Sequence, residues 1–366
     1  MTNRQEEAIW AVGLMSGTSM DGVDAAMIRT DGHTVFEVGP TQSVSYEPDF
    51  AQQFKRWLGK KNAPDSIVDH FTRLNAEAVD AVVKKSGIQA SDIGVVGFHG
   101  QTLFHDAPNG ITVQVGNGQL LADLTGINVV TDFRTNDVKS GGEGAPFAPL
   151  YHRALAADLT LPVMVLNLGG VANVSYVGTD ILLAFDTGPA SALIDDWVQL
   201  KGGGLFDEDG KIAARGTVDQ IALAGLMDNP YFDKPAPKSL DRNDFSMTLI
   251  ESLSIEDGAA TLTEFTVQTI AKALDHCPTA PNRWLVTGGG RKNKTMMDGI
   301  ARLVGAAVEP VETVGWNGDE LEAEAFAFLA VRSLRGLPLS LPTTTGVPTP
   351  TTGGRLFQIR RDRQAG

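Results

Sequence analysis

The sequence lacks several features that identify common classes of protein. Its single cysteine, Cys277, excludes an internal disulfide framework and a cysteine-based zinc site. None of its six histidines form a His-x-x-x-His pair and no EF-hand loop occurs, so we expect no metal held by protein ligands alone. A Walker A lysine motif is missing, and the absence of Gly-x-Ser-x-Gly argues against a hydrolase nucleophile elbow.

Long apolar runs and an excess of positive charge are missing as well. No stretch approaches the roughly 20 apolar residues of a membrane span, and residues 1–7 are polar, so we expect no membrane partner. Lysine and arginine total 30 against 44 aspartates and glutamates, which argues against a nucleic-acid partner because phosphate-backbone binding uses clustered cations. We expect a cytoplasmic enzyme that meets any anionic substrate at a local positive site.

The length and the hydrophobic pattern indicate two α/β domains with similar openings. The 366 residues suffice for two domains, and a Gly/Pro-rich stretch near 140–150 suggests the boundary. We therefore predict an N-terminal domain over 1–150, a C-terminal domain over 151–344, and a return of 345–366 to the first. Expected strands cover 8–15, 23–30, 34–38, 93–98, 111–115, 127–132, 163–168, 172–177, 181–185 and 284–287; expected helices cover 64–86, 119–125, 189–200, 262–276, 295–303 and 320–334.

The turn within residues 13–24 has the composition of a phosphate-binding loop. Its sequence is Gly-Leu-Met-Ser-Gly-Thr-Ser-Met-Asp-Gly-Val-Asp, placed between two expected strands. Glycines at such a turn expose backbone N–H groups to an anion, and Asp21 and Asp24 could hold a hydrated Mg²⁺ beside it. An ordinary hairpin is the alternative interpretation.

Two further glycine-rich turns lie in the second half. Gly169 and Gly170 occupy the place that the serine-rich turn has in the first half, so two facing folds would put both turns on one cleft. Gly288, Gly289 and Gly290 join an expected strand to a helix, whose N-terminus suits a nucleotide phosphate. A tight turn without a ligand is the alternative for this segment.

Three polar side chains are placed at expected strand ends. Asp186 follows the strand over 181–185 and precedes Pro189, so it is either a helix cap or a general base. His99 lies between Phe98 and Gly100 and could bind a substrate. Arg134 offers a fork for a carboxylate or phosphate, with a surface ion pair as the alternative.

Taken together, these motifs resemble those of the anhydro-N-acetylmuramic acid kinases, and the resemblance covers nearly the whole chain. Glu322-Ala323 with Phe326-Ala327 extends it into the last expected helix. The motifs are 13–24, His-Gly-Gln-Thr at 99–102, Asp-Phe-Arg at 132–134 with Gly-Gly-Glu-Gly-Ala-Pro at 141–146, Asn-Leu-Gly-Gly-Val-Ala-Asn at 167–173, Phe-Asp-Thr-Gly-Pro at 185–189, and the glycines at 288–290.

The resemblance implies two ribonuclease-H-like domains of the actin, sugar kinase and heat-shock ATPase type with a central ATP cleft. It implies ATP-dependent phosphorylation of 1,6-anhydro-N-acetylmuramic acid with hydrolytic opening of the anhydro ring. The products would be N-acetylmuramic acid 6-phosphate and ADP, in the recycling of peptidoglycan. ATP, Mg²⁺ and the sugar would be the ligands, and a homodimer is expected from the resemblance alone.

The resemblance also assigns roles to residues. Asp186 would be the base that activates water, and Arg134 would bind the lactyl carboxylate. His99 and Glu322 are candidates for contacts to the sugar ring or amide. The expected nucleotide-binding residues are Gly17, Thr18, Ser19, Met20, Asp21, Gly22, Val23 and Asp24, with Gly169, Gly170, Gly288, Gly289 and Gly290.

One departure and two alternatives accompany this interpretation. Ala190-Ser191 stands where many family members have Gly-Asn, which puts the contacts just beyond Asp186 in doubt. A kinase of an ordinary amino sugar would use Asp186 on a sugar hydroxyl instead of water. A non-catalytic sugar or nucleotide sensor is the third possibility.

Overall fold

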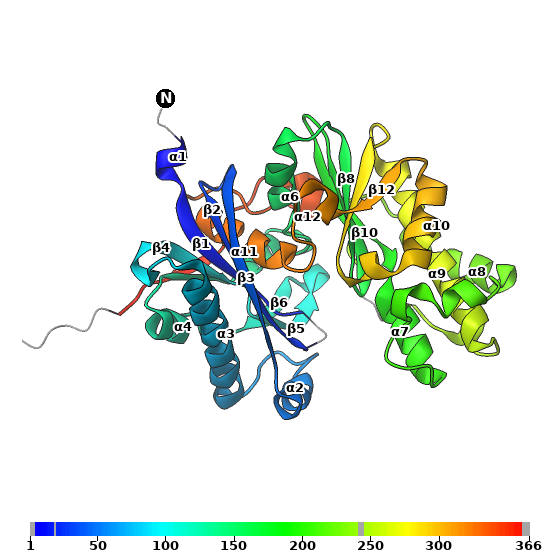
Figure 1. Cartoon of the computed structure of the whole chain (residues 1–366), viewed down its shortest axis with the longest axis horizontal. Helices are drawn as coiled ribbons and strands as arrows, with labels where there is room; N and C mark the ends of the chain where they lie inside the picture. The colour runs from blue at the N-terminus through cyan, green and yellow to red at the C-terminus, as the bar shows by residue number, and fades with distance from the viewer. Residues whose placement is uncertain (1–3, 18–19, 241–244, 361–366) are drawn as a thin grey trace, which may run out of the picture. The chain divides into compact units, whose positions relative to one another are not determined.

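The chain folds into two compact units. The computed structural model describes residues 4–17, 20–240 and 245–360. Unit 1 comprises Met1–Leu155 and Glu320–Gly366, and unit 2 comprises Ala156–Asp319 (Figure 1). Among these described residues, no helix has both the length and the apolar character that a membrane crossing requires.

Unit 1 is built on a mixed six-stranded sheet with the order β13-β7-β4-β1-β2-β3. The first three strands of the chain form an antiparallel meander, β4 and β7 join β1 in parallel, and β13 closes the edge antiparallel to β7. The strands are β1 (Ile9–Met15), β2 (Gly22–Thr30), β3 (Val35–Ser45), β4 (Ile93–Phe98), β7 (Val129–Thr131) and β13 (Arg355–Phe357).

Unit 2 repeats this topology in a five-stranded sheet with the order β10-β9-β8-β11-β12. Again three antiparallel strands come first and two parallel strands follow on the other side of the first one. This repeated order confirms the predicted fold class, two ribonuclease-H-like α/β units. The strands are β8 (Val163–Leu168), β9 (Val171–Val177), β10 (Leu182–Pro189), β11 (Arg283–Thr287) and β12 (Ala307–Pro310).

Helices and one small hairpin complete the units. The hairpin pairs β5 (Gln101–Asp106) with β6 (Ile111–Val115) outside the main sheets. Unit 1 has α1 (Arg4–Glu7), α2 (Pro48–Lys55), α3 (Asp65–Ser86), α4 (Gly118–Thr125), α5 (Thr135–Lys139), α6 (Pro149–Leu155), α11 (Leu321–Leu334) and α12 (Pro342–Thr345). Unit 2 has α7 (Ser191–Leu200), α8 (Gln220–Met227), α9 (Ile255–Ala271) and α10 (Lys294–Val304).

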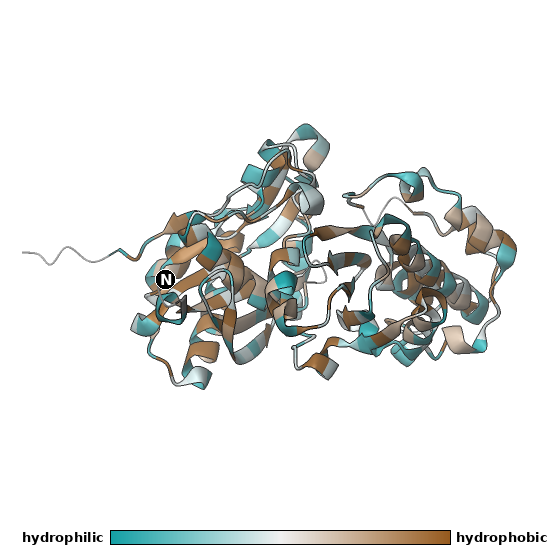
Figure 2. Cartoon of the chain, turned by 90° about the horizontal axis from the view of Figure 1, so that it is seen from above, coloured by the Kyte–Doolittle hydropathy of each residue, from teal (hydrophilic) through white to brown (hydrophobic). Residues whose placement is uncertain are grey.

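Helices α3 and α11 cover opposite faces of the unit 1 sheet. Val12 and Leu14 of β1 belong to the buried cluster that includes Phe71 and Val79 of α3. Gly13, between them, faces α11, as expected because successive residues of a strand point to opposite sides. The centre of the sheet is therefore buried on both faces, which explains the nearly continuous apolar runs of β1 and β4. Figure 2 shows hydrophobic stretches of the ribbon in this unit in brown.

The main chain of α11 rests directly on the centre of this sheet. Gly13 and Gly97 are neighbours in the parallel β1–β4 ladder. A Cβ at Gly13 would lie 1.8 Å from the carbonyl oxygen of Ala323, and one at Gly97 would lie 2.1 Å from that of Phe326. Side chains are therefore excluded at both strand positions, and the two glycines fix the place of the helix.

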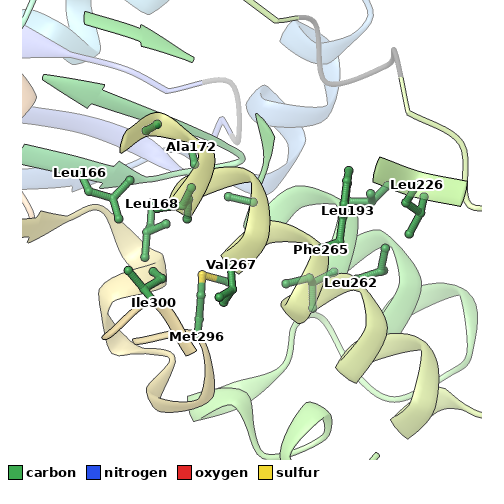
Figure 3. Packing of buried hydrophobic residues seen from close by; sticks show 14 of the residues in the cluster. Leu166, Leu168, Ala172, Leu193, Leu226, Leu262, Phe265, Val267, Met296 and Ile300 are labelled. Atoms are coloured by element: carbon green, nitrogen blue, oxygen red, sulfur yellow. The ribbon is translucent and has the colours of Figure 1, made fainter. Parts of the chain in front are cut away.

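Unit 2 has its own core between the sheet and the helices α7, α9 and α10. Figure 3 shows Met296 and Ile300 of α10 close to Val267 of α9, and Phe265 of α9 near Leu193 of α7. These five side chains are at most 7% exposed. The amphipathic periodicity of each helix directs its apolar side chains into this cluster.

The structure corrects one predicted domain range. Residues 320–344 were assigned to the second domain, but Glu320 begins the second segment of unit 1. The reason is packing: α11 lies against β1, β2 and β4. The amphipathic pattern predicts a helix there but carries no information about which sheet the helix covers.

The start of the helix after Asp186 was also predicted wrongly. Strand β10 continues through Pro189, which pairs with Val171, and α7 begins only at Ser191. Proline is tolerated at this strand end because β10 is the edge strand of its sheet. Asp186 therefore lies within the strand and not at a junction with the helix.

Replacement of Gly13 by alanine should destabilise unit 1 by about 3 kcal/mol, because the added methyl group cannot fit against the α11 main chain. Gly289→Ala is the matched control, since a Cβ there meets nothing within 4 Å. We expect the free energy of unfolding of that variant to lie within about 0.5 kcal/mol of the parent value. Urea unfolding followed by circular dichroism measures both. Equal stability of the two variants would contradict the direct helix–sheet contact.

Candidate functional site

The serine-rich turn connects two antiparallel strands and is fixed from one side by Tyr46. Met15 pairs with Asp24, so residues 16–21 form the connection. The Tyr46 hydroxyl donates to Ser16 Oγ (2.9 Å), and the Tyr46 N–H donates to the carbonyl oxygen of Asp21 (2.9 Å). The strands thus pair as a hairpin does, but the connection is longer than a tight two-residue turn.

The predicted residues of this turn have different surroundings. Met20 has a positive φ of 58° and is buried, and Asp21 is exposed. Gly22, Val23 and Asp24 belong to β2, where Val23 is fully buried in the core. Gly22 is required by packing, since a Cβ there would lie 2.5 Å from the carbonyl oxygen of Val44. Thr18 and Ser19 lie outside the described residues.

The negative charges of Asp21 and Asp24 both reach the Tyr46 phenol. Burial raises the pKa of Tyr46 well above its usual value, side-chain hydrogen bonds with Ser16 and Asn75 oppose this, and the two carboxylates reinforce it. Tyr46 is therefore uncharged and acts as a hydrogen-bond donor. The two acids are close enough to act on the same group, as a shared role requires.

Unit 1 brings together the three residues predicted to bind substrate. His99 follows β4, Arg134 follows β7, and Glu322 lies in the first turn of α11. Because β4 and β7 are parallel neighbours, their carboxyl ends meet at one edge of the sheet. Arg134 Nε donates to His99 Nε2 (3.0 Å), and its Nη1 donates to the carbonyl oxygen of Gly144 (2.5 Å).

Electrostatics keep His99 neutral and Arg134 cationic. Burial, reinforced by the charge of Arg134, lowers the pKa of His99 well below its usual value, against the opposing effect of a bond to Gly100. Since Nε2 accepts from Arg134, the neutral ring carries its proton on Nδ1. Desolvation lowers the pKa of Arg134, while Glu322 and Asp137 raise it. Arg134 supplies the positive charge of this cluster, with the carboxylates of Glu322 and Asp137 as its acidic neighbours.

Glu322 links this cluster to the turn. Glu322 is solvent-exposed, and partial desolvation by neighbouring protein groups raises the pKa of its carboxyl. Arg134 lowers that pKa and Asp24 of β2 raises it. Arg134 and Asp24 therefore both act on Glu322 within unit 1.

Asp137 supports the Arg134 site, and the sequence analysis did not single it out. Its side chain is 1% exposed, and its carboxylate accepts from the Gly144 N–H (2.7 Å) and the Thr345 hydroxyl (2.6 Å). The loop over 140–146, interpreted from sequence as the approach to a domain boundary, is folded around this carboxylate. A Cβ at Gly142 would lie 2.3 Å from Asp137 Oδ1. Asp137 thereby fixes Gly144, which in turn holds Arg134.

Asp186 in unit 2 is held by main-chain groups. It pairs with Asn173 next to a register shift that lies between Asp186 and Gly188. Its Oδ2 accepts from the Leu240 N–H (2.9 Å), and its own N–H donates to the carbonyl oxygen of Lys238 (2.9 Å). The N-cap of α7 is Ala190, so the prediction that Asp186 caps this helix is wrong.

The carbonyl oxygens of Gly169 and Gly170 accept hydrogen bonds from the N-terminus of α7. The Ser191 N–H donates to Gly169, and the N–H groups of Ala190 and Ala192 donate to Gly170. These interactions satisfy N–H groups that open helix ends leave unpaired. Ala190, the N-cap of α7, is fully buried and has φ of −128° and ψ of −121°.

The three glycines after β11 differ in what they require. A Cβ at Gly288 would lie 2.4 Å from Asn167 Oδ1, and one at Gly290 would lie 2.7 Å from Leu168 Cβ. Gly289 faces open space. It borders a cavity of roughly 450 Å³, within the usual size range of small-molecule sites. The cavity is lined by Ser191, Ile194, Asp195, Phe206, Asp207, Glu208, Asp209, Gly289, Gly290, Lys292, Asn293 and Met296.

The fold and these sites define a class of duplicated ribonuclease-H-like α/β proteins. One unit carries the cluster of His99, Arg134 and Glu322, called the cationic cluster below, and the other carries the cavity beside Gly289 and Gly290, called the glycine-bordered cavity. The family model described as anhydro-N-acetylmuramic acid kinase matches residues 9–358. The chain therefore belongs to the anhydro-N-acetylmuramic acid kinase family and is a kinase.

Individual relatives agree with this assignment. The enzyme of that name from Rhodospirillum rubrum is 51% identical over 354 residues, covering 95% of this chain and 94% of the relative. The one from Paramagnetospirillum magneticum is 50% identical over 349 residues, covering 94% of this chain and 98% of the relative.

Among solved structures, the activator of 2-hydroxyisocaproyl-CoA dehydratase from Clostridium difficile is 13% identical with a TM-score of 0.47, covering 90% of this chain and 96% of that chain. The ROK hexokinase from Thermus thermophilus is 15% identical with a TM-score of 0.42, covering 90% and 100%.

Asp137→Ala should destabilise unit 1 by about 3 kcal/mol, because it leaves the buried Gly144 N–H and Thr345 hydroxyl without their acceptor. Thr345→Val removes only one of these bonds and should cost about 1 kcal/mol. Urea unfolding gives both values, and hydrogen exchange at the Gly144 amide should accelerate in the first variant alone. Unchanged exchange there would show that the loop does not depend on Asp137.

Proposed function

We propose that this kinase phosphorylates 1,6-anhydro-N-acetylmuramic acid with ATP and opens its anhydro ring with water in the same reaction. Oxygen O6 of this sugar is tied to C1 and is not a free hydroxyl. Water therefore adds to C1, the C1–O6 bond breaks, O6 takes the γ-phosphoryl group, and ADP leaves. The products are N-acetylmuramic acid 6-phosphate and ADP.

The observation that carries the proposal is the fixed carboxylate of Asp186. It is half-buried at the edge of a sheet and accepts a hydrogen bond from Leu240, so its orientation is set before substrate arrives. A carboxylate held in this way can accept the proton that the attacking water releases. General base catalysis of this kind contributes about 10²–10⁴-fold in rate.

The sugar is assigned to the cationic cluster of unit 1. Arg134 supplies the charge and the fork geometry for the lactyl carboxylate. Neutral His99 and exposed Glu322 then serve as polar partners for the ring or amide. The anchoring of Arg134 through Gly144 supports this assignment, because a pre-oriented guanidinium loses little freedom on binding.

ATP is assigned to the glycine-bordered cavity of unit 2 and to the turn of unit 1. Gly289 allows close approach at the cavity rim, where no protein atom explains the absence of a side chain. The turn around Gly17, Met20 and Asp21 is assigned to the phosphates. The first N–H groups of α7 already donate to the carbonyl oxygens of Gly169 and Gly170. These N–H groups are therefore not assigned to the phosphates, and the two glycines would instead leave space for them.

Mg²⁺ is part of the proposal, with Asp21 and Asp24 as its partners. Their carboxylates suit the ion, which is usually held by one or two carboxylates together with water and phosphate oxygens. Within residues 4–17, 20–240 and 245–360, no group of three or more His, Cys, Asp or Glu could hold a metal. The donor set thus fits an ion that arrives with the nucleotide and neutralises phosphate charge.

The cellular context follows from the substrate. An anhydro sugar of muramic acid derives from peptidoglycan, so we infer a role in recycling the cell wall. A cytoplasmic location and a homodimeric assembly complete this inference, and the homodimer rests on the family resemblance.

Asp186→Asn should abolish turnover while ATP still binds, because the amide cannot accept the proton but keeps an oxygen for the Leu240 N–H. We expect kcat to fall by about 10³-fold. A coupled ADP assay measures turnover, and titration calorimetry measures ATP affinity. Activity close to that of the parent enzyme would remove Asp186 from the role of base.

The source of the new hydroxyl tests the ring-opening step. In ¹⁸O-labelled water the sugar phosphate should carry one label, at C1, when the reaction is stopped before the anomeric hydroxyl exchanges. Mass spectrometry with fragmentation locates the label. N-acetylmuramic acid 6-phosphate incubated in the same water is the control for exchange. An unlabelled product would favour a kinase that deprotonates a sugar hydroxyl.

A further inference from the structure

We propose that Tyr231 is a positioning residue for Asp186, a role that rests on the proposed function of Asp186 as base. Tyr231 lies in the three-proline segment 228–240, which folds against the outer side of β10. Its hydroxyl donates a 2.6 Å hydrogen bond to the main-chain carbonyl oxygen of Asp186. Because this bond is made to the main-chain carbonyl oxygen, it supports Asp186 through the backbone of the strand.

The need for such a support follows from the place of Asp186 in the sheet. Strand β10 is an edge strand, and every second residue of an edge strand turns its N–H and C=O groups away from its neighbour. Asp186 is such a residue, because its N–H and C=O both bond to the segment 231–238. The register shift beside it also loosens the pairing with β9, and such shifts re-aim side chains.

The segment 228–240 is itself held by contacts within unit 2, so its hydrogen bonds can fix the position of Asp186. The Asn229 side chain accepts from the Tyr231 N–H (2.9 Å) and starts a short 3₁₀ turn, η6 (Pro230–Asp233). Phe232 packs edge-on against Phe265 of the core, with ring centroids 5.8 Å apart. Lys238 Nζ donates to the carbonyl oxygens of Tyr231 and Phe232 and lies 4.8 Å from the Tyr231 ring centroid.

Three hydrogen bonds from one segment therefore surround one catalytic candidate. Lys238 accepts from the Asp186 N–H, Tyr231 donates to its carbonyl oxygen, and Leu240 donates to its Oδ2. Of these, only the Tyr231 bond comes from a side chain and can be removed by substitution without touching the main chain. Tyr231 is 6% exposed, so the bond is shielded from competing water.

Tyr231→Phe tests the proposal, because it keeps the ring and removes only the hydroxyl. We expect kcat to fall about tenfold, since small misplacements of a reacting group cost one to two orders of magnitude. The KM values for ATP and sugar should stay within about twofold, because Tyr231 touches neither of the assigned binding regions. Thermal unfolding is recorded on the same sample.

Tyr176→Phe is the matched control. Tyr176 is 2% exposed in the same unit, and its hydroxyl bonds to Thr279 and not to β10. Both variants lose one buried hydroxyl contact, so similar decreases in Tm are expected, but only Tyr231→Phe should lower kcat. Equal kcat values for the two variants would overturn the positioning role.

Two further variants separate the possible failures. If the Tm of Tyr231→Phe lies far below that of the control, Asn229→Ala becomes the test, because it removes the side chain that accepts from the Tyr231 N–H. The kcat of that variant should fall with KM unchanged. Asp186→Asn is measured alongside. If it is inactive while Tyr231→Phe matches the parent enzyme, the positioning role fails and the base stands. If Asp186→Asn is fully active, both proposals fail.

Discussion

The direct contact between the main chain of α11 and the centre of the unit 1 sheet is the constraint on which that unit depends. It exists because Gly13 and Gly97 leave no side chain between the helix and the strands. The contact fixes the first turn of α11, and with it Glu322, beside the strand end that carries Arg134. Helix–sheet packing thus places Glu322, whereas the parallel neighbours β4 and β7 bring His99 and Arg134 together.

A second constraint, in unit 2, concerns the edge strand β10. The main chain of an edge residue lacks the partners that a second neighbouring strand would supply. The segment 228–240 supplies those partners to Asp186. The main chain of Asp186 is therefore fixed although β10 lies at the edge of its sheet.

Much of the fold could be predicted because buried strands in a duplicated α/β topology have short, bounded apolar runs. The strands over 93–98, 111–115 and 163–168 match the structure to the residue. The unit that α11 joins was not predictable from its periodicity, although Gly13 and Gly97 mark the strand positions that a helix approaches. Asp137 and Tyr231 escaped prediction because their partners lie far along the chain, at Thr345 and Asp186. Local sequence carries no signal for such contacts.

The central claim is that this family member transfers phosphate from ATP to 1,6-anhydro-N-acetylmuramic acid. ADP release by the purified full-length protein, with and without that sugar, tests it most directly. The account predicts ADP release that requires the sugar and equals the amount of sugar phosphate formed. ADP release at the same rate in both samples, or none in either, would contradict it.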